Sequence, residues 1–212
     1  MFGSLEIYNH FQYKMRHFKH IFIILFVLTS CSTEMDSDLE TAVNNGYVSE
    51  NYDDLPGTLY EGGTTTTATS VSAGENHTCA VLSGGTVKCW GLGDYGQLGN
   101  GSTSAQTTPV TVSSISTAAS VSVGGSHTCG VLSGGALKCW GSGAYGRLGN
   151  GDTSNQSTPV SVSISTVTSV SAGGDHTCAL LSGGSLKCWG YGGYGQLGNG
   201  SFDNQYTPVT VK

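Results

Sequence analysis

Apolar and polar residues alternate over short runs in the C-terminal part of the chain, and the runs recur in a fixed order. The first copy has an alternating run at 70–74 (SVSAG), runs at 77–82 (HTCAVL) and 86–90 (TVKCW) on either side of a Ser-Gly-Gly turn, and a last run at 108–112 (TPVTV). Alternation over five or six residues, bounded by glycines, is typical of short β-strands joined by tight turns. We therefore expect four strands in each copy.

The copies recur with a period of about fifty residues. His77, His127 and His176 open the same strand in each copy and are separated by 50 and 49 positions. Repeats of this length indicate a propeller or a solenoid, and four strands per repeat fit one blade of a β-propeller. The sequence therefore predicts an all-β fold, with three four-stranded blades within residues 64–212, at approximately 68–117, 118–167 and 168–212.

Composition supports strands and argues against a nucleic-acid partner. Glycine accounts for 33 of the 212 residues, and charged residues make up only 10% of the chain, which is too little for a helical bundle. Eight of the fourteen acidic residues lie within 34–61, whereas the sequence from Gly62 onward has five acids and five bases. The repeats are therefore neutral, and they carry no basic stripe that would follow a phosphate backbone.

The N-terminus has the pattern of an export signal. Lys14, Arg16 and Lys19 precede the apolar run Ile21–Leu28, which as a helix would span only about 12 Å, well short of the roughly 30 Å hydrocarbon core. The run is therefore expected to be a signal-peptide core within residues 1–30. The sequence Leu-Thr-Ser-Cys that ends at Cys31 resembles the cleavage site of bacterial lipoproteins, which implies a lipid on Cys31. An ordinary signal peptide with a free thiol at Cys31 is the alternative.

The residues on either side of Cys31 also suit an exported protein. Met15 is a more ordinary start than Met1, so we interpret residues 1–14 as an upstream extension of the reading frame. Residues 31–63 are acidic and lack apolar periodicity, which predicts a disordered, flexible tether. We expect a membrane-anchored lipoprotein outside the cytoplasm, at the cell envelope or cell surface.

The seven cysteines divide into Cys31 and three pairs, one pair in each repeat. If Ser-Gly-Gly is a three-residue hairpin loop, Leu82 lies opposite Thr86 and Cys79 lies opposite Cys89 on one face of the sheet. In an exported protein such an even set indicates disulfides. Bonds between blades are the alternative, but the register favours a bond within each hairpin: Cys79–Cys89, Cys129–Cys139 and Cys178–Cys188.

The run GENHTCAVLSGGTVKCWGLGDYGQLGNG, followed by Thr-Pro-Val, resembles the repeat of the regulator of chromosome condensation family over about residues 68–212. Arg147 stands where the other copies have Gln97 and Gln196. The resemblance implies a partial propeller of the seven-bladed type. The paired cysteines suit an exported branch of that family. Kelch repeats share the period and the double glycine but lack the Gly-Gln-Leu-Gly run, and they are the second choice.

Two residue types recur once per blade and are interpreted as structural. A large ring at one position per blade suits packing between blades, and each histidine is expected to be neutral and hydrogen-bonded to backbone within its own blade. No carboxylate or thiolate accompanies all three histidines, so no metal site is expected. The residues are His77, His127 and His176 with Trp90, Trp140 and Trp189.

No catalytic set and no cofactor site are expected. The glycines at 91, 93 and 96 match the spacing GxGxxG literally, as do their counterparts in the other copies. A dinucleotide site needs that motif to open a helix after a parallel strand, whereas here Gln-Leu-Gly-Asn-Gly follows. The match is therefore interpreted as a turn-rich loop.

These observations favour a non-enzymatic protein-binding or structural module, because the strands are constant while the loop residues vary. The family resemblance implies guanine-nucleotide exchange as one alternative and inhibition of a secreted or periplasmic enzyme as another. Three blades also leave the outer faces of the first and last blade uncovered. Either further blades follow in a longer gene, which we favour, or copies associate to complete a ring, or the disulfides hold an open arc together.

Overall fold

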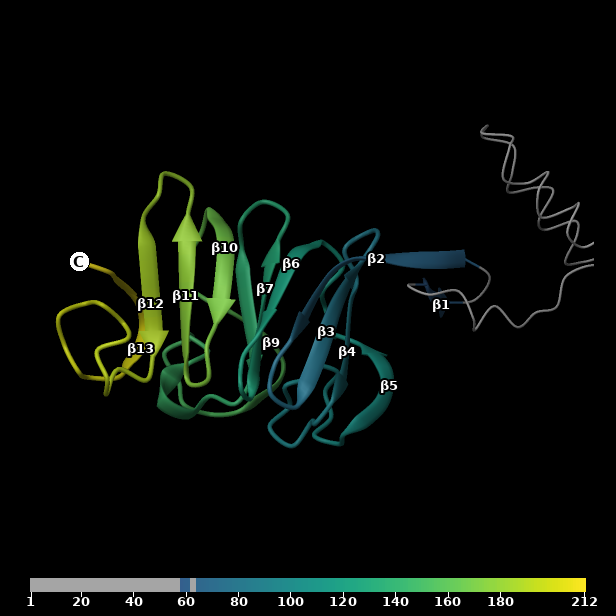
Figure 1. Ribbon diagram of the computed structural model, residues 1–212, viewed down its shortest axis with the longest axis horizontal. Helices are drawn as coiled ribbons and strands as arrows, with labels where there is room; N and C mark the ends of the chain where they lie inside the picture. The colour runs from purple at the N-terminus through teal and green to yellow at the C-terminus, as the bar shows by residue number, and fades with distance from the viewer. Residues whose placement is uncertain (1–57, 62–63) are drawn as a thin grey trace, which may run out of the picture. The chain divides into compact units, whose positions relative to one another are not determined.

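The computed structural model describes residues 58–61 and 64–212, which form thirteen strands in three antiparallel sheets (Figure 1). The predicted signal peptide, the lipidation site Cys31 and most of the predicted tether lie outside the described residues. Within the described part, no helix has the length and apolar character needed to cross a bilayer.

Each sheet corresponds to one sequence repeat, and its four repeat strands follow one another in chain order. Blade 1 consists of β2 (Thr64–Ala73), β3 (His77–Leu82), β4 (Val87–Gly91) and β5 (Gln106–Thr111). Blade 2 consists of β6 (Ala118–Val123), β7 (His127–Leu132), β8 (Leu137–Gly141) and β9 (Gln156–Ser161). Blade 3 consists of β10 (Val167–Ala172), β11 (His176–Leu181), β12 (Leu186–Gly190) and β13 (Gln205–Thr210). The three-blade architecture predicted from the sequence is confirmed.

Blade 1 carries one strand more than the sequence predicts. The segment β1 (Thr58–Glu61), which falls in the predicted tether, pairs antiparallel with the start of β2, and Thr58 lies opposite Thr67. Residues 58–61, at the end of the predicted tether, thus form a strand. Its run Thr-Leu-Tyr has high strand propensity, and its partner strand is rich in threonine.

The central hairpin of each blade has the predicted register. Val81 lies opposite Val87 and Cys79 opposite Cys89, with the loop closed by a hydrogen bond of 2.9 Å from the Gly85 N–H to the Leu82 carbonyl. Both loop glycines have positive φ, which only glycine adopts at little cost. This register places the cysteines at Cα separations of 4.1, 4.1 and 4.0 Å, and the three bonds within hairpins are present: Cys79–Cys89, Cys129–Cys139 and Cys178–Cys188.

The two faces of a blade are chemically different, and adjacent blades bury unlike faces against each other. The Cys face carries the disulfide and the two apolar residues nearest the hairpin loop, and the Trp face carries the tryptophan. The Cys face of blade 1 packs against Val121, Val123 and Trp140 of blade 2. The Cys face of blade 2 packs in the same way against Trp189 of blade 3. The cores therefore lie between adjacent blades. Figure 1 shows the three blades side by side.

Candidate functional site

The junction between blades 1 and 2 contains a buried chain of hydrogen bonds, which we call the latch. The His77 Nε2 atom lies 2.8 Å from the Thr128 hydroxyl, and that hydroxyl donates to the Gln97 carbonyl at 3.0 Å. The Trp140 indole N–H donates to the same carbonyl at 2.9 Å. Because the single hydroxyl proton of Thr128 is used, His77 is the donor to Thr128 and carries its proton on Nε2.

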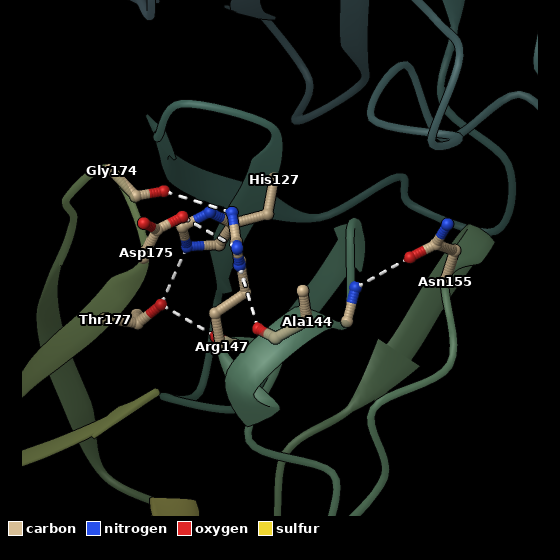
Figure 2. A network of polar contacts seen from close by, with 8 residues as sticks. His127, Ala144, Arg147, Asn155, Gly174, Asp175 and Thr177 are labelled. Carbon is tan, nitrogen blue, oxygen red and sulfur yellow. Dashed lines mark hydrogen bonds and ion pairs between the residues drawn. The ribbon is translucent and has the colours of Figure 1, made fainter. Parts of the chain in front are cut away.

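The second junction repeats the latch atom for atom, and Figure 2 shows its histidine, its threonine and the arginine that supplies the loop carbonyl. His127 Nε2 lies 2.8 Å from the Thr177 hydroxyl, and Thr177 and Trp189 both donate to the Arg147 carbonyl at 2.9 Å. All of these donors are fully or almost fully buried. Each latch joins a histidine and a loop carbonyl of one blade to a threonine and a tryptophan of the next, so the junction has a fixed direction along the chain.

The expected partner of the histidines was wrong. His77 and His127 bond a threonine side chain of the next blade, about fifty positions along the sequence, and not the backbone of their own blade. His176 lies at the same place in blade 3, but its ring makes no hydrogen bond within the described part of the chain. Trp140 and Trp189 are completely buried between blades. Trp90 is only partly buried, because no blade precedes it in the described residues.

Burial keeps both latch histidines neutral. Desolvation lowers the pKa of His77 to about 4 and the pKa of His127 to about 3, and in His127 the Arg147 guanidinium acts in the same direction. The Nδ1 atom of each ring is buried and has no hydrogen-bond partner among residues 58–61 and 64–212. Protonation would place a donor at that atom with no acceptor, so the latch requires the neutral imidazole.

Arg147 gives the second junction an ion pair that the first junction lacks. Its guanidinium, 6% exposed, lies 2.7 Å from the carboxylate of Asp175 in blade 3 and donates to the Gly174 carbonyl at 3.2 Å (Figure 2). At the first junction Gln97 is completely buried, and its amide nitrogen has no hydrogen-bond partner in the part of the chain that the structure describes. The counterpart of Asp175 there is the neutral Ser126. The two junctions therefore share the latch but differ in charge.

The same substitution changes the backbone of the glycine-rich loop. In blades 1 and 3 the glutamine side-chain oxygen accepts the backbone N–H of the tyrosine two positions earlier, at 2.9 Å in Tyr95 and in Tyr194. An arginine offers no acceptor, and its Nε donates instead to the Ala144 carbonyl at 3.0 Å. Tyr145 there has a φ of 61°, an uncommon conformation for a bulky residue.

An aromatic surface covers the loops of blades 2 and 3. The ring of Tyr191 lies 5.0 Å from that of Tyr145 and 5.6 Å from that of Tyr194, measured between centroids. A Cβ added at Gly195 would lie 3.5 Å from the Phe202 ring, and Gly146 lies against Tyr206. Four of these rings are between 45% and 85% exposed. We define the aromatic surface as Tyr145, Tyr191, Tyr194, Phe202 and Tyr206.

The glycine-rich loop forms successive turns where a nucleotide site would need a helix. The Gly96 N–H bonds the Gly93 carbonyl, and the Gly99 N–H bonds the Gly96 carbonyl. Gly99 must be a glycine, since its φ is +68° and a Cβ there would lie 2.7 Å from the Trp140 indole nitrogen. In the described residues, no three His, Cys, Asp or Glu side chains are grouped so that they could hold a metal ion.

Sequences of known proteins identify the fold as a run of β-propeller blades. The regulator of chromosome condensation (RCC1) repeat matches residues 84–131, 135–180 and 184–212, and a second pattern of the same repeat matches 68–97, 118–147 and 167–196. The chain belongs to the RCC1 repeat family.

Solved structures agree with this assignment. Prp20p from Saccharomyces cerevisiae is similar, with a TM-score of 0.63 and 22% identity over 68% of this chain and 38% of that protein. Yeast RCC1 (Prp20) in its complex with Kap60 matches with the same score and identity and is covered over 37% of its length. The chain therefore spans less than two fifths of these relatives. At this identity the likeness shows the fold.

Arg147 and Asp175 are the residues whose importance the sequence analysis missed. Arg147 was noted only as a departure from the glutamine of the other copies. The signal was present, because the copy with the arginine is followed by the copy that has an aspartate before its histidine. Reading the two departures together predicts an ion pair between adjacent repeats.

Proposed function

We propose that the chain is a non-enzymatic protein-binding module, held at the bacterial cell envelope by a lipid on Cys31. The observation that carries the proposal is the aromatic surface. Tyrosine and phenylalanine side chains offer large contact area with few rotatable bonds, and they are enriched at the centres of protein interfaces. Here Tyr206 lies at the start of β13 and the other four lie in connections between strands, in two blades that disulfides and a latch stabilise.

The composition of the loops supports a binding role for blade 3 in particular. Tyr191, Phe202 and Tyr206 stand where blade 2 has Ser142, Thr153 and Ser157. The strand that precedes these positions, Leu-Lys-Cys-Trp-Gly, is identical in the two blades. Aromatic side chains therefore accumulate at positions that the fold itself leaves free to vary.

The family relation supports protein binding in a general sense. Prp20p is described together with its binding to Gsp1p and histones, and a second structure has Kap60 bound to yeast RCC1 (Prp20). These partners are properties of the yeast protein. Exchange on a small GTPase remains an alternative here, although a disulfide-bonded, exported chain would not meet such a partner.

Capture of envelope proteins tests the proposal. We expect the tagged chain to retain a specific protein that a Phe202→Ser, Tyr194→Ser double variant loses. Leu186→Ser is the matched control, because Leu186 is an exposed apolar residue outside the aromatic surface. Equal capture by all three chains would contradict binding at this surface. Incorporation of labelled palmitate, abolished in Cys31→Ala, tests the anchor separately.

A further inference from the structure

Asparagine followed by glycine recurs at the same place in the glycine-rich loop of every repeat, and two of these pairs lie at the junctions between described blades. They are Asn100 with Gly101 and Asn150 with Gly151. Asparagine is most prone to spontaneous deamidation before glycine, because glycine has no side chain to hinder attack by its own backbone nitrogen on the asparagine amide. Both pairs are therefore candidate sites of this modification.

At each junction the nitrogen that would attack is bonded to the next blade. The Gly101 N–H donates to the Ser157 carbonyl in β9, and the Gly151 N–H donates to the Tyr206 carbonyl in β13, each at 2.9 Å. Such a nitrogen has to give up this hydrogen bond before it can lose its proton and turn toward the asparagine. The closed junction thus restrains the reacting atom.

The asparagine side chains are restrained as well. The Asn100 Oδ1 atom accepts the backbone N–H of Ser102 at 3.1 Å, and the Asn150 Oδ1 atom accepts that of Asp152 at 3.2 Å. Both asparagines are half-buried, but the glycines that follow them are exposed, so water reaches the loops. The geometry of the closed junction, and not exclusion of water, is what opposes the reaction.

From these contacts we propose that Asn100 and Asn150 are deamidation sites protected by the closed junctions, and that each is modified at the rate at which its own junction opens. The glycine nitrogen loses its proton and bonds the asparagine Cγ atom, and the amide nitrogen leaves as ammonia. Water then opens the cyclic imide to aspartate or isoaspartate. The reaction needs no oxidant and no cofactor.

The modification would keep an opened junction from closing well. Isoaspartate places the Cβ atom in the main chain, which moves the glycine nitrogen away from the carbonyl of the next blade. Both products also add a negative charge, and at position 150 this charge lies near that of Asp152. Deamidation would therefore mark, irreversibly, the chains whose junctions have opened. It involves neither the aromatic side chains nor Cys31, so it holds or fails independently of the proposed function.

Variants of the two latches test whether each junction controls its own site. Thr128→Val removes the latch hydroxyl of the first junction and Thr177→Val that of the second, and neither changes a loop asparagine or glycine. Asp175→Asn is a milder change at the second junction, because the carboxylate is half exposed. Gly183→Ala, in the hairpin loop of blade 3, is the matched control, since a Cβ there has nothing within 4 Å.

The full 212-residue chain is incubated in mildly alkaline buffer with a mild detergent, then reduced, digested with trypsin and analysed by mass spectrometry. Cleavage after Lys138 and Arg147 places Asn100 and Asn150 in separate peptides. The same chain in guanidinium chloride gives the unprotected rate at each site. We expect both sites of the folded wild type to react at least about 30-fold more slowly than in the unfolded chain.

The variants should affect the two sites separately. Thr128→Val should accelerate deamidation of Asn100 at least about 5-fold and leave Asn150 unchanged, and Thr177→Val should do the reverse. Asp175→Asn should accelerate Asn150 alone. Gly183→Ala should change neither rate. Circular dichroism and the three disulfides would verify that each variant folds.

Three results would overturn the proposal. The first is an equal rate in the folded and the unfolded wild-type chain, which would show that the junctions give no protection. The second is acceleration of both sites by each threonine variant or by Gly183→Ala, which would show that the reaction follows unfolding of the whole array. The third is a pair of threonine variants with unchanged rates, because the latches would then not control the loops.

Discussion

The stability of the blades should fall steeply in mild acid, because the two latch histidines stay neutral in the folded chain but bind protons in the unfolded chain. An exposed histidine has a pKa of 6.5, whereas burial lowers the pKa of His77 to about 4 and that of His127 to about 3. Between these values the unfolded chain binds protons that the folded chain excludes, so stability decreases as the pH falls below 6.5. The loss ends for each histidine near its folded pKa.

The size of the effect follows from the same values. One pH unit below 6.5 costs about 1.4 kcal/mol per neutral histidine, so at pH 5 each latch loses about 2 kcal/mol and the pair about 4 kcal/mol. This is a large fraction of the stability of an ordinary domain. We expect urea denaturation, followed by tryptophan fluorescence, to show this loss between pH 7 and pH 5.

Glutamine variants isolate the contribution of the histidines. His77→Gln and His127→Gln remove the titrating ring and keep a side-chain donor, so each should reduce the loss between pH 7 and pH 5 by about 2 kcal/mol. The double variant should lose about 4 kcal/mol less than the wild type. If the wild type and the double variant had the same pH dependence, the latch histidines would not be buried in their neutral form and the reasoning would fail.

Four further tests examine other parts of the fold, each by urea denaturation. Gly99→Ala should lower the free energy of unfolding by at least about 2 kcal/mol more than Gly134→Ala. Both glycines have positive φ, but only a Cβ at Gly99 would meet Trp140, since a Cβ at Gly134 would have nothing within 4 Å. Equal losses would exclude a packing effect. Trp189→Phe removes the donor to the Arg147 carbonyl and should cost about 1–3 kcal/mol, less if water replaces the indole N–H. A double-mutant cycle of Arg147→Met and Asp175→Asn should give a coupling energy of about 1 kcal/mol, because the guanidinium is buried but the carboxylate is half exposed. A coupling energy of zero would mean that the ion pair does not contribute to stability. Replacing Cys129 and Cys139 together by alanine should lower the stability by at most about 3 kcal/mol, and an unchanged midpoint would refute stabilisation by that bond.

The features that depend on neighbouring residues were predictable from the sequence. The Ser-Gly-Gly loop fixes the register of the hairpin, and the register places Cys79 opposite Cys89, so the disulfides followed from counting. The number of strands per repeat followed in the same way, from alternating runs separated by glycines. Each of these predictions uses contacts between residues that are close along the chain.

The features that depend on contacts between blades were not predictable in the same way. The partner of His77 is Thr128, 51 positions away, and nothing within one repeat shows that its imidazole points toward the next blade. The replacement of glutamine by Arg147 has no visible structural role until its distance to Asp175 is known. Strand β1 was missed because four residues are too few to show an alternating pattern, and its pairing with β2 is visible only in the structure.

The shared latch has a consequence for how such an array can change its length. An in-frame duplication of one fifty-residue unit would supply a histidine and a loop carbonyl for the blade after it, and a threonine and a tryptophan for the blade before it, with nothing else to adjust. Duplicating the unit that contains Arg147 would be less neutral, because the new copy would set an arginine opposite Ser126, where no carboxylate awaits it. The ion pair of Arg147 and Asp175 thus favours blade 3 directly after blade 2.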